Sequence, residues 1–278
     1  MKARILFFLL GATAMFINGA AQAADAAPTP KPAESAPKSD DDGWIVTVGV
    51  IGAVAPSYPG SAHFRPYPFP TVNIRKLNEP EHFSTPDDGF GFAVVDVDGF
   101  RMGPVANFVF RRGNRDGLFG LHQVGLTHEV GGFAEYDFLD HFRTRAELRQ
   151  GIDGHEGFVA VLGADVFSRE NAVTFSLGPR LSFGNNAYAN SYFSVSPGEA
   201  LLNGHLTPYQ ATGGFTSAGG VATLRYDITP NFNATLYTGL QHLAGSVGSS
   251  PIPSMIGSRD QFTAGLSFSR SFEIRKFW

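Results

Sequence analysis

The sequence predicts a closed, antiparallel, all-β barrel that spans a membrane. Three observations lead to this prediction: an N-terminal export signal, long segments in which apolar and polar residues alternate, and connections that are alternately short and long. The 278-residue chain has a formal net charge of −4 and no basic block, which argues against a nucleic acid as partner. It has no cysteine, so disulfides, thiolate metal sites and lipid attachment through cysteine are excluded.

The first residues have the features of a secretory signal peptide. Lys2 and Arg4 precede an apolar stretch over residues 5–17, which is too short to span a bilayer. Ala21-Gln22-Ala23 then matches the small-residue pattern of a cleavage site. An uncleaved membrane anchor is the alternative. The expected organisation is a signal peptide (1–23), a disordered periplasmic leader (24–42) and an outer-membrane barrel (43–278).

Alternation of apolar and polar residues is clearest near the C-terminus. Between residues 262 and 274 the even positions are mostly Phe, Leu and Ile, whereas the odd positions are mostly Thr, Gly and Ser. Successive side chains of a strand point to opposite faces, so this segment has one apolar and one polar face. Residues 142–149, 173–183 and 231–241 show the same alternation. A soluble β-sandwich would show it too.

The lengths of the strands and of their connections favour a membrane barrel over a sandwich. The alternating segments run to about ten to twelve residues, as a tilted membrane-crossing strand requires, whereas globular strands average about five or six. Membrane barrels also have tight periplasmic turns and long outer loops. The short links are 98–101, 139–141, 169–171 and 229–230, and the long ones are 113–125, 184–214 and 244–260.

The number of strands follows from their parity. Eleven strands are evident, and this odd number would place the N-terminus outside the cell. We therefore expect a further short strand at Glu81–Thr85, which pairs through Pro86-Asp87-Asp88 with Phe90–Val97. The predicted barrel has twelve strands, and ten is the alternative number.

Several motifs resemble the MipA/OmpV family of outer-membrane proteins. Residues 56–61 match the family's P-x-Y-x-G-S element, and Pro68-Phe69-Pro70 matches a P-x-P segment that follows it. Residues 188–195 resemble its Y-x-x-x-YFGV run, with Ser194 in place of the usual glycine. The motif residues are Pro56, Tyr58, Gly60 and Ser61 in the first half, and Tyr188, Tyr192, Phe193, Val195, Ser250 and Pro251 in the second.

The resemblance extends over nearly the whole chain from Trp44 and implies a barrel in the outer-membrane lipid of a Gram-negative bacterium. Family members are described as scaffolds that link a murein-degrading transglycosylase to a murein synthase, and others as adhesins or porin-like proteins. The first expected function is therefore a scaffold for murein-synthesis or murein-hydrolysis proteins in the periplasm. A small-solute, anion-preferring channel is the alternative, and a barrel hydrolase is a third possibility.

Charged residues on one strand face predict a charged lumen. Four charges alternate with apolar and small residues between positions 142 and 149. They could form an anion-favouring pore, or they could pair with one another and fill a narrow barrel. The candidate lumen charges are Arg143, Arg145, Glu147, Arg149, Arg180, Arg225 and Asp227.

No catalytic, cofactor or metal site is predicted. The Gly-x-Ser-x-Gly motif, which carries the nucleophilic serine in many hydrolases, does not occur. The histidines lack the compact spacing of a metal-binding site. His128, beside Glu129, is the histidine to inspect first for a catalytic role. The long loop Asn185–Gly213 is the candidate for contact with a partner, with a folded-in plug or a disordered cap as the alternatives.

Overall fold

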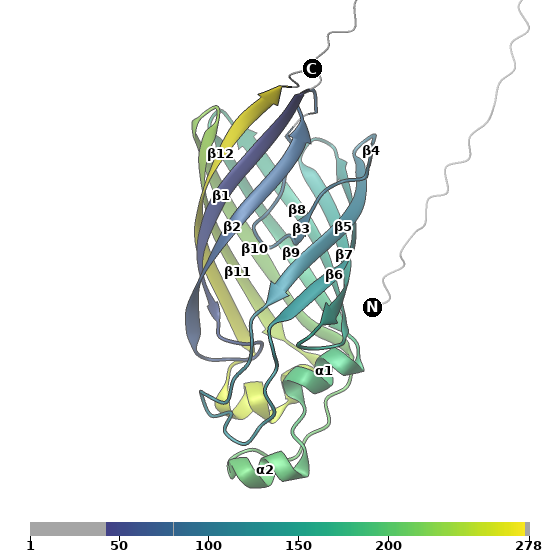
Figure 1. Ribbon diagram of the computed structural model, residues 1–278, viewed down its shortest axis with the longest axis vertical. Helices are drawn as coiled ribbons and strands as arrows, with labels where there is room; N and C mark the ends of the chain where they lie inside the picture. The colour runs from purple at the N-terminus through teal and green to yellow at the C-terminus, as the bar shows by residue number, and fades with distance from the viewer. Residues whose placement is uncertain (1–42, 80, 276–278) are drawn as a thin grey trace, which may run out of the picture. The chain divides into compact units, whose positions relative to one another are not determined.

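The structure is a computed structural model that describes residues 43–79 and 81–275. The predicted signal peptide and leader lie outside these residues. The described strands form one twelve-stranded sheet in the order β2-β1-β12-β11-β10-β9-β8-β7-β6-β5-β3, with β4 paired to β5, and neighbouring strands pair antiparallel (Figure 1). The predicted all-β, antiparallel barrel is confirmed, and its sheet is nearly closed.

The strands that form the wall of the barrel are mostly ten to sixteen residues long. They are β1 (Gly43–Pro56), β2 (Phe64–Lys76), β3 (Phe90–Gly91), β4 (Val95–Val97), β5 (Phe100–Val109), β6 (Thr127–Phe138), β7 (Phe142–Ile152), β8 (Phe158–Glu170), β9 (Val173–Gly184), β10 (Gly214–Thr229), β11 (Phe232–Leu243) and β12 (Asp260–Arg275). The helical segments are α1 (Asn186–Phe193), α2 (Pro197–Asn203), α3 (Gly245–Ser249) and the π-helical turn η1 (Ile252–Ile256). None of the helices in the described part of the chain has the length and apolar character needed to cross a membrane.

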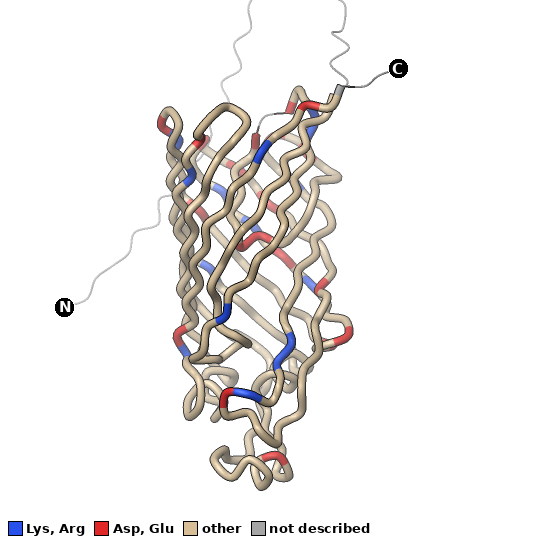
Figure 2. Tube along the Cα trace, turned by 60° about the vertical axis from the view of Figure 1, so that its left-hand side comes forward, with Lys and Arg blue, Asp and Glu red and all other residues tan. Residues whose placement is uncertain are grey.

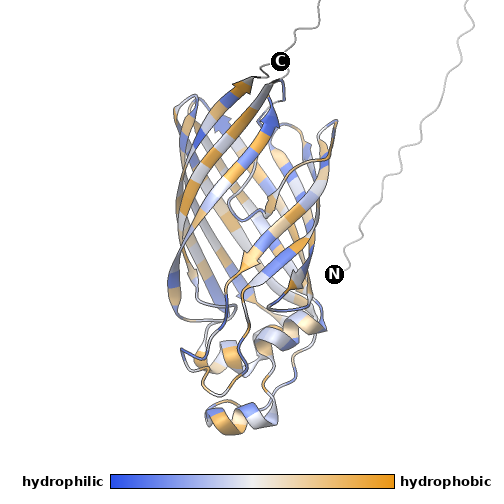
Figure 3. Cartoon of the chain, in the orientation of Figure 1, coloured by the Kyte–Doolittle hydropathy of each residue, from blue (hydrophilic) through white to orange (hydrophobic). Residues whose placement is uncertain are grey.

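Alternation along the strands gives the barrel an apolar outer face. On β9, Phe175 and Leu177 are exposed. Thr174, which precedes Phe175, and Ser176, which lies between the two, are buried. The same pattern recurs from strand to strand (Figure 3). So much exposed apolar surface is unfavourable in water and is the expected surface of a barrel embedded in lipid.

The two ends of the barrel differ. Apart from the connection that follows β2, the long connections lie at one end together with the helical segments of the described residues, and we call it the long-loop end (Figure 1). The other end, the short-turn end, carries tight turns in which Asp98, Leu139 and Asn171 have positive φ angles. Gly43 pairs with Arg275, so both termini of the described barrel lie at the short-turn end. In membrane barrels the short turns face the periplasm.

The predicted strand at Glu81–Thr85 is wrong. Residues 81–85 have no strand structure, and the chain after β2 instead turns back through the lumen. Phe83 stacks on Phe167 with ring centroids 4.3 Å apart, and Asp88 binds a wall arginine. After β2 the chain therefore runs back through the lumen and not as a strand of the wall. As a result, β2 and the interrupted edge strand β3–β4 run in the same direction. The number twelve arises because this edge strand is in two pieces.

Candidate functional site

Arg143 is the centre of a buried ion-pair network in the lumen. Its position on β7 lies directly opposite Asp165 on β8, and its Nη2 donates to Asp165 Oδ2 at 2.7 Å. Nη1 donates to Asp88 Oδ2 at 2.6 Å, and Nη2 donates to Thr85 Oγ1 at 3.1 Å. Only 1% of the Arg143 side chain is exposed. This one guanidinium therefore joins two wall strands to residues 81–89, the stretch that returns through the lumen and that we call the internal segment.

The network continues through the rest of the predicted lumen charges on β7 and β9. Arg180 binds Asp87 at 2.7 Å and Asp165 at 2.9 Å. Acidic and basic positions accordingly occur together in the middle of the barrel (Figure 2). Further ion pairs of the network are Arg145 with Glu135 (2.6 Å) and Glu147 (2.7 Å), Arg149 with Glu129 (2.9 Å) and Glu147, Arg101 with Glu135, and His155 with Glu129 (3.0 Å).

Most of the charges in this network are paired with opposite charges. Six carboxylates face five arginines, His155 also binds Glu129, and most of these side chains are buried. Buried charges are retained when they are paired in this way. Arg225 and Asp227 form a separate pair on β10 at 2.7 Å, and Arg225 also binds Glu81 of the internal segment. The predicted lumen charges are therefore paired with carboxylates, as one of the two alternatives expected, but they fill only part of the lumen.

A cavity of about 1360 Å³ lies beside the network. The network occupies the side of the lumen formed by β5–β9, whereas small polar residues of β1, β2 and β10–β12 line much of the cavity. Its wall includes Thr47, Thr71, Asn73, Thr223, Thr235, Thr263, Ser267 and Ser269. The cavity reaches from Lys76 and Glu81 near the short-turn end to Tyr58 and Pro59 at the long-loop end. It is large enough for a small organic molecule.

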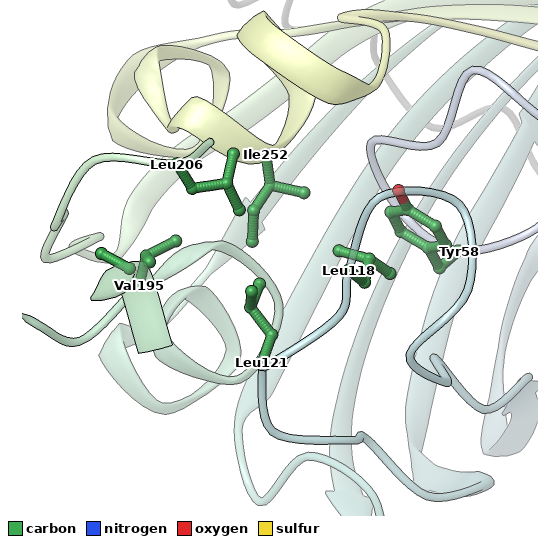
Figure 4. Packing of buried hydrophobic residues seen from close by; sticks show 7 residues of the cluster. Tyr58, Leu118, Leu121, Val195, Leu206 and Ile252 are labelled. Carbon is green, nitrogen blue, oxygen red and sulfur yellow. The ribbon is translucent and has the colours of Figure 1, made fainter. Parts of the chain in front are cut away.

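A packed cap closes over the long-loop end. Its first apolar cluster joins four different loops, because Tyr58, Leu118, Val195 and Ile252 are far apart in sequence and are all buried together (Figure 4). Leu121, Ala200 and Leu206 complete it. The predicted loop Asn185–Gly213 thus contains two helices and packs against the other loops in this cap at the end of the barrel.

The motif residues from both halves of the chain meet in the cap. Tyr192 and Phe193 are fully buried in a second cluster, with Tyr188 packed against it. Ser250 Oγ, followed by the buried Pro251, donates to the carbonyl oxygen of Phe193 at 2.6 Å. Gly60 has a φ of 94°, which favours glycine, and its N–H donates to the side chain of Gln261 on β12 at 2.9 Å. Ser61 Oγ closes the same turn by donating to His63 O at 3.1 Å, and Pro56 ends β1 before it.

Arg112 is a buried cation in the cap that sequence reasoning missed. It has no exposed surface, and its guanidinium donates to Tyr192 O at 2.5 Å and to His122 O at 3.0 Å. Burial lowers the pKa of Arg112 to about 10. Arg111-Arg112 follows an apparent strand, so only the folded arrangement shows that one arginine points inward.

Glu199 makes the cap sensitive to acid. Partial burial alone would raise its pKa, but hydrogen bonds from the backbone N–H groups of His122 (2.7 Å) and Ser196 (2.8 Å) outweigh this effect and lower the pKa to about 2. Because this pKa is below the ordinary value of 4.5, the stabilisation is complete above pH 4.5 and is lost as the pH falls towards 2.

Glu199→Gln should therefore destabilise the cap near neutral pH by about 1 kcal/mol, since it weakens the capping box at the start of α2. Hydrogen exchange of the α2 amides, corrected for intrinsic rates, measures the effect between pH 7 and pH 3. The wild-type protein should lose protection towards acid, and the variant should show a much flatter response. Equal acid responses in the two proteins would contradict this role.

His128 and Glu129 do not form a catalytic pair. They are consecutive on β6, so their side chains point to opposite faces: His128 lies against Phe108 on the outside, while Glu129 is buried in the lumen. The buried histidine that does bind Glu129 is His155, and its other ring nitrogen accepts from the N–H of Gly157 at 3.3 Å. Among the described residues, no group of three or more His, Asp or Glu side chains is arranged to hold a metal ion.

Comparison with known proteins identifies the family of this chain. A family model described as "MltA-interacting protein MipA" matches residues 48–272. Similar solved structures include an outer membrane channel from Pseudomonas putida F1 (10% identity, 86% of this chain and 100% of that chain, TM-score 0.43), the NanC porin (11%, 82% and 98%, 0.39) and the N-terminal β-barrel domain of Pseudomonas aeruginosa OprF (12%, 82% and 97%, 0.29). No curated protein sequence matches the chain.

Proposed function

Because this chain belongs to the family of the MltA-interacting protein MipA and folds as an outer-membrane β-barrel, we propose that it anchors a murein-related partner at the inner surface of the outer membrane. The proposal includes export through a cleaved signal peptide in a Gram-negative bacterium. The partner is a murein-degrading enzyme of the MltA kind, the protein named in the family description. A murein synthase is the second partner that such an anchor would hold.

The paired charges of the lumen and the packed cap together support this proposal. The lumen charges bind one another and the internal segment, so they rigidify the wall. The cap buries apolar side chains from four loops at the outer end. A rigid, capped barrel offers its short-turn end to the periplasm, where a murein enzyme works.

We propose that the chain acts by binding rather than by catalysis. The His155–Glu129 pair is enclosed by Tyr188 and Tyr192, whose rings lie 5.2 Å and 5.6 Å from the imidazole. Both nitrogens of the His155 ring already have partners within the protein. A general base must instead have a nitrogen within reach of a nucleophile or substrate.

The cavity beside the network favours a second candidate, the passage of small solutes. The arginines that suggested a preference for anions are bound to carboxylates, and the cap lies across the outer end. Passage across the membrane would therefore require the cap to move. Conductance of the protein with an intact cap and with an unpacked cap distinguishes this candidate from the anchor.

Leu139 is the surface residue through which we test the anchor. It lies in the turn between β6 and β7, is 75% exposed and has a φ of 53°, and the next residue, Asp140, has a φ of 59°. This left-handed backbone costs about 1–2 kcal/mol for a residue other than glycine, asparagine or aspartate. An exposed leucine in such a turn is unfavourable locally, and contact with a partner would account for it.

Leu139→Asn should weaken capture of the partner at least fivefold while leaving the barrel as stable as before or more stable, because asparagine tolerates positive φ. Purified protein in lipid vesicles is mixed with a purified MltA-type transglycosylase, and the bound fraction is titrated. Leu201→Asn is the matched control, since Leu201 is 84% exposed in α2 at the opposite end. Equal capture by both variants would overturn the assigned surface, and absence of binding by the wild-type protein would overturn the anchor itself.

A further inference from the structure

The wall of the barrel has a seam between β2 and the β3–β5 edge. The sheet order ends at β2 on one side and at β3 on the other, and among the described residues no hydrogen-bonded ladder joins these ends. Figure 1 shows β2 and β5, the strand that carries β3 and β4, apart at the front of the barrel. The seam exists because the internal segment leaves the wall here, so that β2 and β3–β4 run in the same direction.

Three prolines keep the β2 edge from pairing. Pro66, Pro68 and Pro70 occupy alternate positions of β2, and its ladder with β1 is unbroken over all of them. Alternate residues of an antiparallel strand direct their N–H groups to opposite sides, and a proline has no N–H to give. The three ring nitrogens must therefore face the seam. Along this half of β2 the free edge has no backbone donor, as is typical of protected sheet edges.

The cavity of the lumen reaches this seam. Its lining includes Thr71 and Asn73, on the inner face of β2, together with their neighbours Val72 and Ile74, whose side chains are exposed on the outer face. The cavity therefore extends along the free edge of β2, where lumen and bilayer meet. Phe90, Phe92, Val94 and Phe108 line the cavity from the opposite side of the seam, and they are also exposed on the outer face.

Aromatic side chains close the seam nearer the long-loop end. The Phe110 ring lies 4.4 Å from that of Tyr67 and 5.2 Å from that of Phe69, between centroids. These contacts connect β2 to the segment after β5 through side chains alone. The open part of the seam is therefore the stretch nearer the short-turn end. It has Val72 and Ile74 of β2 on one side and Phe92 and Val94 on the other.

We propose that this seam is a lateral portal through which a single-chain amphiphile, such as a fatty acid, enters the cavity from the bilayer. The seam lies in the apolar belt, so hydrocarbon chains are what surrounds it in a membrane. The apolar side chains on its two edges receive the chain, and the hydroxyl and amide groups of Thr71 and Asn73 receive the polar head. This binding site is independent of the proposed anchoring function.

The test closes and reopens the portal in one protein. The chain has no cysteine, so Val72→Cys/Val94→Cys can be cross-linked specifically with a reducible bifunctional maleimide. The protein is reconstituted in phosphatidylcholine vesicles with nitroxide-labelled stearic acid, and electron paramagnetic resonance measures the immobilised fraction. We expect an immobilised component of about one fatty acid per barrel that falls at least threefold on cross-linking and returns on reduction. Equal spectra in the closed and reopened states would overturn the portal.

Two controls define the ligand and the site. Phosphatidylcholine with a nitroxide at the same chain depth should show no component that depends on the cross-link, and such a component would overturn the single-chain assignment. If the cross-linked protein does not fold, Val72→Trp narrows the seam directly and should reduce the immobilised fraction at least threefold. Val54→Trp, on the outer face of β1, is its matched control and should leave the fraction unchanged.

Discussion

Replacing Arg143 with methionine should lower the free energy of unfolding by about 3–5 kcal/mol, because it leaves buried carboxylates without their cation. Asp88 and Asp165 both lose their closest arginine contact in this variant, and Thr85 loses a donor. Methionine keeps much of the side-chain volume, so the loss reports on charge more than on packing. The internal segment should also detach from β7, since Arg143 is its main tie to that strand.

Urea unfolding of the reconstituted protein, followed by tryptophan fluorescence, measures this loss. Arg259→Met is the matched control, because Arg259 is exposed and the same substitution there should change the stability by less than about 0.5 kcal/mol. Adding Asp88→Asn to Arg143→Met should recover part of the loss, since one uncompensated charge is then removed. A loss no larger than that of the control, or no recovery in the double variant, would show that the network does not stabilise the barrel.

The wall of this barrel could be predicted from the sequence because its physics is local. In residues 173–183 the environment changes at every position, so the alternation of Val, Phe and Leu with Thr, Ser and Arg is enough to assign both faces. The same reasoning placed Arg143 and Arg180 on the inner face. Their partners could not be assigned, because Arg143 meets Asp165 only in one particular register of β7 and β8.

The internal segment and the cap depend on contacts between distant parts of the chain. Pro86-Asp87-Asp88 has the composition of an ordinary turn, and only the arginines of β7 and β9 draw it into the lumen. Parity correctly indicated that the chain must return across the barrel, but not that it returns inside the wall. Likewise, the sequence around the motif residues Tyr58, Phe193 and Ser250 does not predict that they come together in the cap. The resemblance to the family identified all three, but not their contacts.

The cap should depend most strongly on Phe193. This side chain has no exposed surface, lies against the rings of Tyr188 and Tyr192, and is close enough to Gly60 that a Cβ there would be 3.4 Å from its ring. Phe193→Ala should therefore destabilise the cap by about 3–5 kcal/mol, the cost of removing a fully buried phenylalanine. Hydrogen exchange of the α1 amides should accelerate by about two to three orders of magnitude, while the wall strands keep their protection.

Phe119→Ala is the matched control, because Phe119 belongs to the same cap but is 67% exposed, and its removal should have little effect on exchange. Planar-bilayer recordings then separate the two functional candidates. If the cap seals the cavity, the wild-type protein and Phe119→Ala conduct little, and Phe193→Ala conducts steadily through the unpacked end. Steady conductance of the wild-type protein would favour the channel over the anchor. Equal exchange in the two variants would mean instead that Phe193 does not hold the cap, because loss of its buried ring would then cost no more than loss of an exposed one.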